Sequence, residues 1–129
     1  SVRSLDEDMR DLVQERLSQV AEGTAAANQC EITIEYERGY PITDNNEEAT
    51  QHAISVASSV SEVDTDTPPI MPSEDFAYML MEKPGAFIFL GNGDSQMLHN
   101  PEYIFDDEAI PFGSSWYAGM VEERLPITG

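Results

Sequence analysis

Basic residues are scarce in this chain. Its 129 residues include 25 aspartate and glutamate side chains but only 6 lysine and arginine side chains, and the formal net charge is −19. A protein that binds nucleic acid needs cationic side chains facing the phosphates, so this composition argues against a nucleic-acid partner. Because anionic membrane surfaces also attract cationic groups, it argues against membrane binding as well.

Cysteine and long apolar runs are lacking too. With Cys30 as its only cysteine, the chain cannot form an internal disulfide, which fits a reducing compartment, and we expect a cytoplasmic location. The chain has no run of about 18 apolar residues, and its start does not resemble a signal peptide. Hydrophobic residues nevertheless make up 40% of the chain, which is enough for an apolar core.

The excess of carboxylates leaves two interpretations open. Many carboxylates beside a single lysine, Lys83, keep a surface hydrated at high salt, where dissolved ions screen the repulsion between like charges. A salt-loving source would explain this composition. An acidic cytosolic protein from an ordinary source would explain it equally well.

Hydrophobic periodicity predicts a long first helix over about residues 5–27. Ser4 and Glu7 form a capping box, with the hydroxyl at the N-cap and the carboxylate three residues on. Apolar residues then recur at intervals of three and four, which predicts an inward stripe. The stripe consists of Met9, Leu12, Val13, Leu17, Val20 and Ala21.

Three more helices are expected further along the chain. A cap at residues 44–46 precedes a second helix that ends near Val60, and Ser73 should cap a short third one. The last helix is expected over residues 107–124, with an inward face formed by Trp116, Met120 and Val121.

Strand patterns occur at three places. Ser1–Arg3 look like the end of a strand already under way, which suggests a piece of a longer polypeptide. Residues 30–36 alternate between apolar and polar, which predicts a strand with one wet face and with Cys30 turned inward as a core residue. Ala86–Leu90 are apolar on both faces, which is typical of a buried central strand.

The predicted fold class is therefore α/β (α+β). The element order is β-α-β followed by α-α-β-α, with a boundary near residues 40–44. A long loop over residues 91–106 follows the buried strand.

His99 is the strongest functional candidate, because an imidazole on a loop beyond a buried strand is a common position for a ligand of metal or substrate. His52, on the second predicted helix, is expected to be a solvated or half-buried structural residue. The Glu74–Asp75 pair begins a predicted helix, where carboxylates either complement the helix dipole or perform acid–base chemistry. Spacing alone does not separate these two roles.

Several segments together carry a family resemblance. They are Met71–Tyr78, Pro84–Gly93, Leu98–Pro101, Phe105–Asp107 and Ile110–Gly113, in this order. Their combination resembles the carboxyl-terminal part of the aminoacylase, hippurate hydrolase and auxin-conjugate amidohydrolase family of zinc-type metallopeptidases. Near the front, Val2–Ser4 and Arg38–Pro41 look like parts of that family's inserted lid domain.

The resemblance implies a two-part chain. Residues 1–42 would be the second half of a lid and dimerisation domain, a partial β-α-β unit like half of a ferredoxin fold. Residues 43–129 would be the carboxyl-terminal α-α-β-α segment of a catalytic α/β domain. The implied reaction is hydrolysis of the amide bond of N-acyl amino acids by a metal-activated water, with two divalent ions (Zn, Mn, Co or Ni) in each full-length subunit. The implied partners are a small-molecule substrate and further copies of the protein.

Individual residues match the family's motifs. His99 matches a metal-ligand histidine, whereas Glu74, Asp75, Gly91 and Gly93 match positions that shape the substrate pocket. The resemblance also implies that the catalytic glutamate and the other metal ligands lie in segments absent from these 129 residues. We therefore predict that this chain alone is inactive, binds divalent metal weakly or not at all, and self-associates. The alternatives are a complete, non-catalytic acidic α/β module that binds a protein partner through its sheet edge, and an ordinary α/β domain whose matches to the family are accidental.

Overall fold

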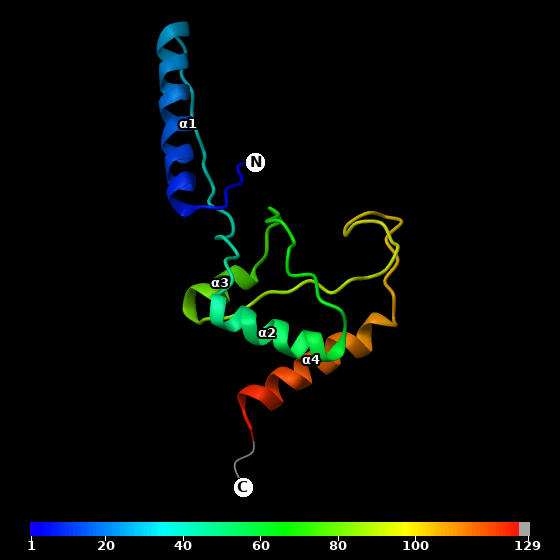
Figure 1. Ribbon diagram of the computed structural model, residues 1–129. Helices are drawn as coiled ribbons and strands as arrows, with labels where there is room; N and C mark the ends of the chain where they lie inside the picture. The colour runs from blue at the N-terminus through cyan, green and yellow to red at the C-terminus, as the bar shows by residue number, and fades with distance from the viewer. Residues whose placement is uncertain (127–129) are drawn as a thin grey trace. The chain divides into compact units, whose positions relative to one another are not determined.

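The computed structural model describes residues 1–126, which contain four α-helices and no β-strand. The helices are α1 (Glu7–Asn28), α2 (Glu47–Val60), α3 (Phe76–Glu82) and α4 (Ala109–Arg124) (Figure 1). All four were predicted, with ends within about three residues of those observed. None of these helices, within the described part of the chain, is long and apolar enough to cross a membrane.

The chain divides into two compact units. The first unit consists of Ser1–Asp44 and Pro68–Lys83, and the second consists of Asn45–Thr67 and Pro84–Gly129. The assignment of residues 1–42 to a lid and of residues 43–129 to a catalytic domain stays a prediction.

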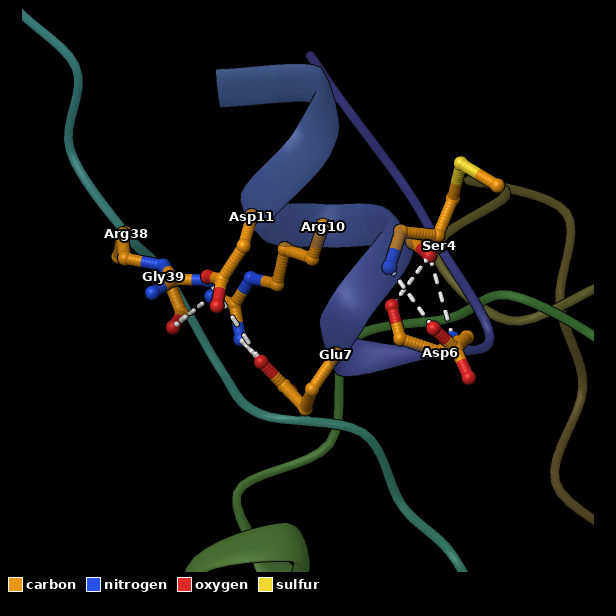
Figure 2. A network of polar contacts seen from close by, with 8 residues as sticks. Ser4, Asp6, Glu7, Arg10, Asp11, Arg38 and Gly39 are labelled. Carbon is orange, nitrogen blue, oxygen red and sulfur yellow. Dashed lines mark hydrogen bonds and ion pairs between the residues drawn. The ribbon is translucent and has the colours of Figure 1, made fainter. Parts of the chain in front are cut away.

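Asp6, rather than Ser4, is the N-cap of α1. The Asp6 carboxylate accepts a hydrogen bond of 2.7 Å from the backbone N–H of Met9. Ser4 Oγ instead donates to the carbonyl of Asp6 at 2.7 Å, which fixes the turn before the helix (Figure 2). The capping-box prediction was wrong by two residues because aspartate caps a helix as well as serine does, and Asp6 lies closer to the first helical turn.

The apolar stripe of α1 is not covered. No residue of α1 is buried, and Met9 and Val20 are among the side chains of the stripe that are exposed. The prediction of an inward face was therefore wrong for the described residues. Periodicity identifies the face that a helix can bury, whereas burial also needs a surface to pack against it.

Two arginines tie α1 to the extended segment that follows it. Arg10 pairs with Glu7 at 3.0 Å and donates to the carbonyl of Gly39 at 2.8 Å, and Arg38 pairs with Asp11 (Figure 2). These polar contacts hold Arg38 and Gly39 beside the first turns of α1, and the extended segment runs along the helix (Figure 1).

The three predicted strands are not formed in the described residues. Residues 1–3, 30–36 and 86–90 lie outside any β-strand, and Cys30 is exposed rather than turned into a core. In the predicted central strand, Phe89 is 60% exposed and Leu90 is 50% exposed. Alternation and apolar runs indicate an extended backbone, but a strand also needs a neighbour to accept and donate its hydrogen bonds. The predicted β-α-β unit is therefore not seen, and the α/β class is not confirmed.

The second unit is organised by the packing of α2 against α4 (Figure 1). Ala53 and Val56 of α2 are buried, and the indole N–H of Trp116 donates to the carbonyl of Ala53 at 3.1 Å. A Cβ atom built on Gly119 would lie 2.7 Å from Cγ1 of Val56, so the helices touch where α4 has no side chain. Of the predicted inward face of α4, Trp116 is half-buried, whereas Val121 is 58% exposed.

Candidate functional site

The candidate site is the loop over residues 92–106 in the second unit, which we call the His99 loop. Its two arms are joined by the side chains of Asn92 and Ser95, both half-buried. The Asn92 amide donates to the carbonyl of Ile104 at 2.7 Å and accepts from the backbone N–H of Asp106 at 2.8 Å. Ser95 Oγ donates to the same carbonyl and accepts from the Ile104 N–H, both at 3.0 Å. The loop is thus a compact structure with its ends held together.

His99 lies between these bridges, in the middle of the loop. The backbone N–H of Asn100 donates to the carbonyl of Met97 at 3.1 Å, which closes a tight turn around His99. The φ angle of His99 is 68°, a left-handed conformation that residues other than glycine adopt infrequently. The residue is exposed. A non-glycine residue held in this conformation costs conformational energy, and such residues concentrate at functional sites.

Two glycines were predicted to shape the pocket. Gly93 has a φ of 69°, and a Cβ atom built there would lie 3.8 Å from a carboxylate oxygen of Asp106. Gly93 therefore serves the left-handed backbone at the start of the His99 loop. A Cβ built on Gly91 meets no atom within 4 Å, so the described residues set no steric requirement for glycine there.

The Glu74–Asp75 pair belongs to the first unit, whereas Gly91, Gly93 and His99 belong to the second. Glu74 is half-buried, and its carboxylate accepts from the backbone N–H of Phe76 at 3.2 Å. Asp75 is the N-cap residue of α3, but its side chain makes no capping bond. Ser73 was expected to cap α3, and that prediction was wrong because the helix begins three residues later. Among the described residues, the Glu74 carboxylate performs the local role of satisfying an N–H at the helix start.

A metal site is not assembled by the described residues. Nowhere in residues 1–126 do three or more histidine, cysteine, aspartate or glutamate side chains gather in a way that could hold a metal ion. Near His99, the Asp106 carboxylate accepts from the backbone N–H of Glu108 at 3.0 Å and so supports the turn before α4. An exposed imidazole can serve as one ligand of a divalent ion, and residues 1–126 do not gather the further ligands that such an ion needs.

His52, the other histidine, has a structural environment, as expected. Its side chain is 33% exposed and lies on α2. Nδ1 is 2.8 Å from a carboxylate oxygen of Glu123 on α4, and Nε2 is 3.8 Å from one of Glu48. His52 therefore links α2 to α4 rather than contributing to the His99 loop.

Sequence reasoning missed Asn92 and Ser95. It identified the Gly91–Gly93 segment as a turn after an apolar run, but assigned no role to the asparagine between the glycines. An asparagine directly after such a run carries a donor and an acceptor that can bridge two backbone segments. That signal was present, although the partner 12 residues away could not be read from it.

Comparison with known proteins identifies the class of the molecule. Residues 6–123 match the family described as Peptidase family M20/M25/M40, and the chain belongs to this family. This confirms the resemblance derived from the motifs above. No solved structure matches the chain.

Curated relatives of the chain carry names of a hydrolase and of deacetylases. It is 36% identical over 128 residues to a protein named hippurate hydrolase from Campylobacter jejuni, covering 97% of this chain and 33% of that protein. It is 32% identical over 127 residues to N-acetyldiaminopimelate deacetylase from Pediococcus pentosaceus, covering 97% of this chain and 33% of that protein. It is 34% identical over 114 residues to the Streptococcus suis protein of the same name, covering 87% of this chain and 30% of that protein. The chain thus spans about a third of the length of these relatives.

Proposed function

We propose that this chain is part of a metal-dependent amidohydrolase that cleaves the amide bond of N-acyl amino acids. Membership of the peptidase family over residues 6–123 carries this proposal. The names of the relatives, a hippurate hydrolase and N-acetyldiaminopimelate deacetylases, support a small N-acylated substrate. A substrate of this kind agrees with the scarcity of basic side chains, which disfavours polyanionic partners.

His99 is our candidate ligand for one of the divalent ions. Its imidazole is exposed, and its backbone is held in a left-handed turn by the surrounding loop. A bound divalent ion supplies Lewis acidity at the scissile carbonyl and lowers the pKa of a water molecule. Zinc, manganese, cobalt and nickel all accept an imidazole ligand. Glu74, Asp75, Gly91 and Gly93 remain candidates for shaping the substrate pocket.

The ligand role is tested by substituting His99 without straining the turn. Asparagine tolerates the left-handed conformation better than alanine does, so His99→Asn removes the imidazole and keeps the backbone. We expect kcat/KM for hippurate or N-acetyldiaminopimelate to fall at least about 100-fold in the protein that carries this chain, because ligand loss exceeds the usual outer-shell effects. The substrates, a chelator, and re-addition of each of the four metals should be tested in one assay.

The control is His52→Asn. It removes the chain's other imidazole, which lies between α2 and α4 and pairs with Glu123. Activity of this variant should stay close to that of the unmodified protein. If His99→Asn retains full activity, or if a chelator has no effect on hydrolysis, the metal-ligand assignment is wrong.

Two further parts of the proposal concern the chain by itself. Residues 1–129 alone should neither hydrolyse N-acyl amino acids nor bind divalent metal tightly, because a dinuclear site needs more ligands than His99. Exposed apolar side chains such as Phe89 and Ile32 should also cause self-association. Hydrolysis by the purified chain, or a monodisperse monomer in sedimentation, would contradict these expectations.

A further inference from the structure

The His99 loop is closed by side chains rather than by a backbone ladder. Within residues 1–126, the hydrogen bonds that join its two arms all involve Asn92 or Ser95. Backbone bonds inside the loop are local ones, such as those from Asn100 N–H to the carbonyl of Met97 and from Tyr103 N–H to that of Asn100. Local turns of this kind do not fix the separation of the two arms.

Both bridging side chains converge on Ile104. The carbonyl of Ile104 accepts from Asn92 Nδ2 at 2.7 Å and from Ser95 Oγ at 3.0 Å, so both of its lone pairs are engaged. The Ile104 N–H donates back to Ser95 Oγ at 3.0 Å. The segment between Ser95 and Ile104 is thereby closed into a ring, and His99 lies at its midpoint.

This closure matters for His99 because its left-handed backbone is not an intrinsic preference of histidine. A residue held at a φ of 68° needs surrounding structure that opposes relaxation to the right-handed or extended regions. Opening the ring at Ile104 would remove that constraint. The backbone that carries the imidazole could then relax, and the position from which the ring extends would change.

We propose that Asn92 and Ser95 are positioning residues, which aim the His99 imidazole by bridging the two arms of its loop at Ile104. The inference rests on the proposed function, in which the imidazole binds a divalent ion. Asn92 and Ser95 act on substrate only through His99, so their loss should lower kcat more than it raises KM.

The test uses Asn92→Ala, Ser95→Ala and the conservative Ser95→Thr in the protein that carries this chain. Asn45→Ala is a matched control, because Asn45 makes the same kind of two-bond bridge in the same unit. Its amide donates to the carbonyl of Phe87 at 2.9 Å and accepts from the Phe87 N–H at 2.7 Å. The control thus removes an equivalent bridge that is not part of the His99 loop.

Two readouts report on the loop and on the imidazole directly. Hydrogen exchange should accelerate at least about tenfold at the Asp106 amide in Asn92→Ala and at the Ile104 amide in Ser95→Ala, since each amide loses the side-chain oxygen that accepts its hydrogen bond. The imidazole Cε1–H resonance of His99, assigned by its absence in His99→Asn, should shift in Asn92→Ala and Ser95→Ala. It should be unchanged in Asn45→Ala.

Activity gives the third readout. We expect kcat to fall about 10- to 100-fold in Asn92→Ala and Ser95→Ala, which is the usual effect of losing a residue that orients a ligand. Ser95→Thr keeps the hydroxyl and should restore kcat to within about threefold of the unmodified protein, whereas Asn45→Ala should match it.

The outcomes separate this inference from the proposed function. If His99→Asn abolishes activity while Asn92→Ala and Ser95→Ala leave kcat unchanged, the positioning role is wrong and the proposed function stands. If His99→Asn retains activity, the ligand assignment fails, and the ring resonance still decides whether the bridge aims the imidazole. An unchanged resonance in both alanine variants overturns the inference.

Discussion

The two units of the chain differ in what holds them together. In the second unit, α2 and α4 pack directly, with buried Ala53 and Val56 and with an indole hydrogen bond from Trp116. In the first unit, α1 is longer but has no buried residue, and charged side chains tie it to its neighbouring segment. The longer helix thus depends on local interactions, whereas the shorter pair depends on packing. Helix length in this chain is therefore no guide to tertiary stabilisation.

The largest effect should come from removing Trp116. Trp116→Ala deletes a half-buried indole and its hydrogen bond to the Ala53 carbonyl, which should cost about 3 kcal/mol, near the low end of the usual cost of truncating a tryptophan to alanine. Urea unfolding followed by circular dichroism should show the loss. Trp116→Phe keeps most of the ring area and should lose only about 1 kcal/mol, the usual contribution of one hydrogen bond. An equal loss in the two variants would mean that the hydrogen bond, rather than packing, joins the helices.

The next effect should come from filling the contact at Gly119. A Cβ there would lie 2.7 Å from Cγ1 of Val56, a stiff β-branched side chain, so Gly119→Ala should push α2 and α4 apart. Overpacking typically costs about 1–3 kcal/mol of stability. The better helix propensity of alanine offsets about 1 kcal/mol of that cost. Fluorescence of Trp116, the only tryptophan, should report the loss from the second unit alone.

Gly113→Ala is the matched control on the same helix. Its Cβ would lie 3.2 Å from Cδ2 of Leu90, the end of a flexible side chain that is 50% exposed and can turn away. We expect this variant to be neutral or slightly more stable. If Gly113→Ala and Gly119→Ala are equally damaging, the close helix contact is not what distinguishes Gly119.

A smaller and opposite effect is expected in the first unit. A Cβ on Gly23 meets no atom within 4 Å, so Gly23→Ala should gain the helix propensity of alanine without a clash. The expected increase in stability of α1 is about 0.5–1 kcal/mol, measured as a higher urea midpoint of the helical dichroism. A decrease would show that another surface covers this face of α1.

The smallest effect should come from His52. Its imidazole and the Glu123 carboxylate are each about a third exposed, so solvent weakens their 2.8 Å contact. His52→Gln should lower the stability of the second unit by at most about 1 kcal/mol. A larger loss would mean that this pair, as well as the apolar contact, determines how α2 meets α4. Glu123→Gln provides the reciprocal measurement.

The candidate site was predictable in part. His99 and its loop were identified from one imidazole beyond an apolar run, and family membership was confirmed over residues 6–123. The bridge at Ile104 was not predictable, because its hydrogen bonds join residues far apart in the sequence. Asn92 precedes Ile104 by 12 positions, and Ser95 precedes it by 9. Side-chain hydrogen bonds between residues this far apart produce no repeating pattern in the sequence from which they could be predicted.

The sequence by itself determined the four helices, because apolar residues three or four positions apart mark one helix face within a single turn of the chain. It also determined the family, through short motifs that need no fold to be recognised. Tertiary structure alone decided which apolar faces are covered. The stripe of α1 and the segment 86–90 carry large apolar side chains, yet none of their residues is fully buried, since burial requires a second surface that the same few residues cannot provide.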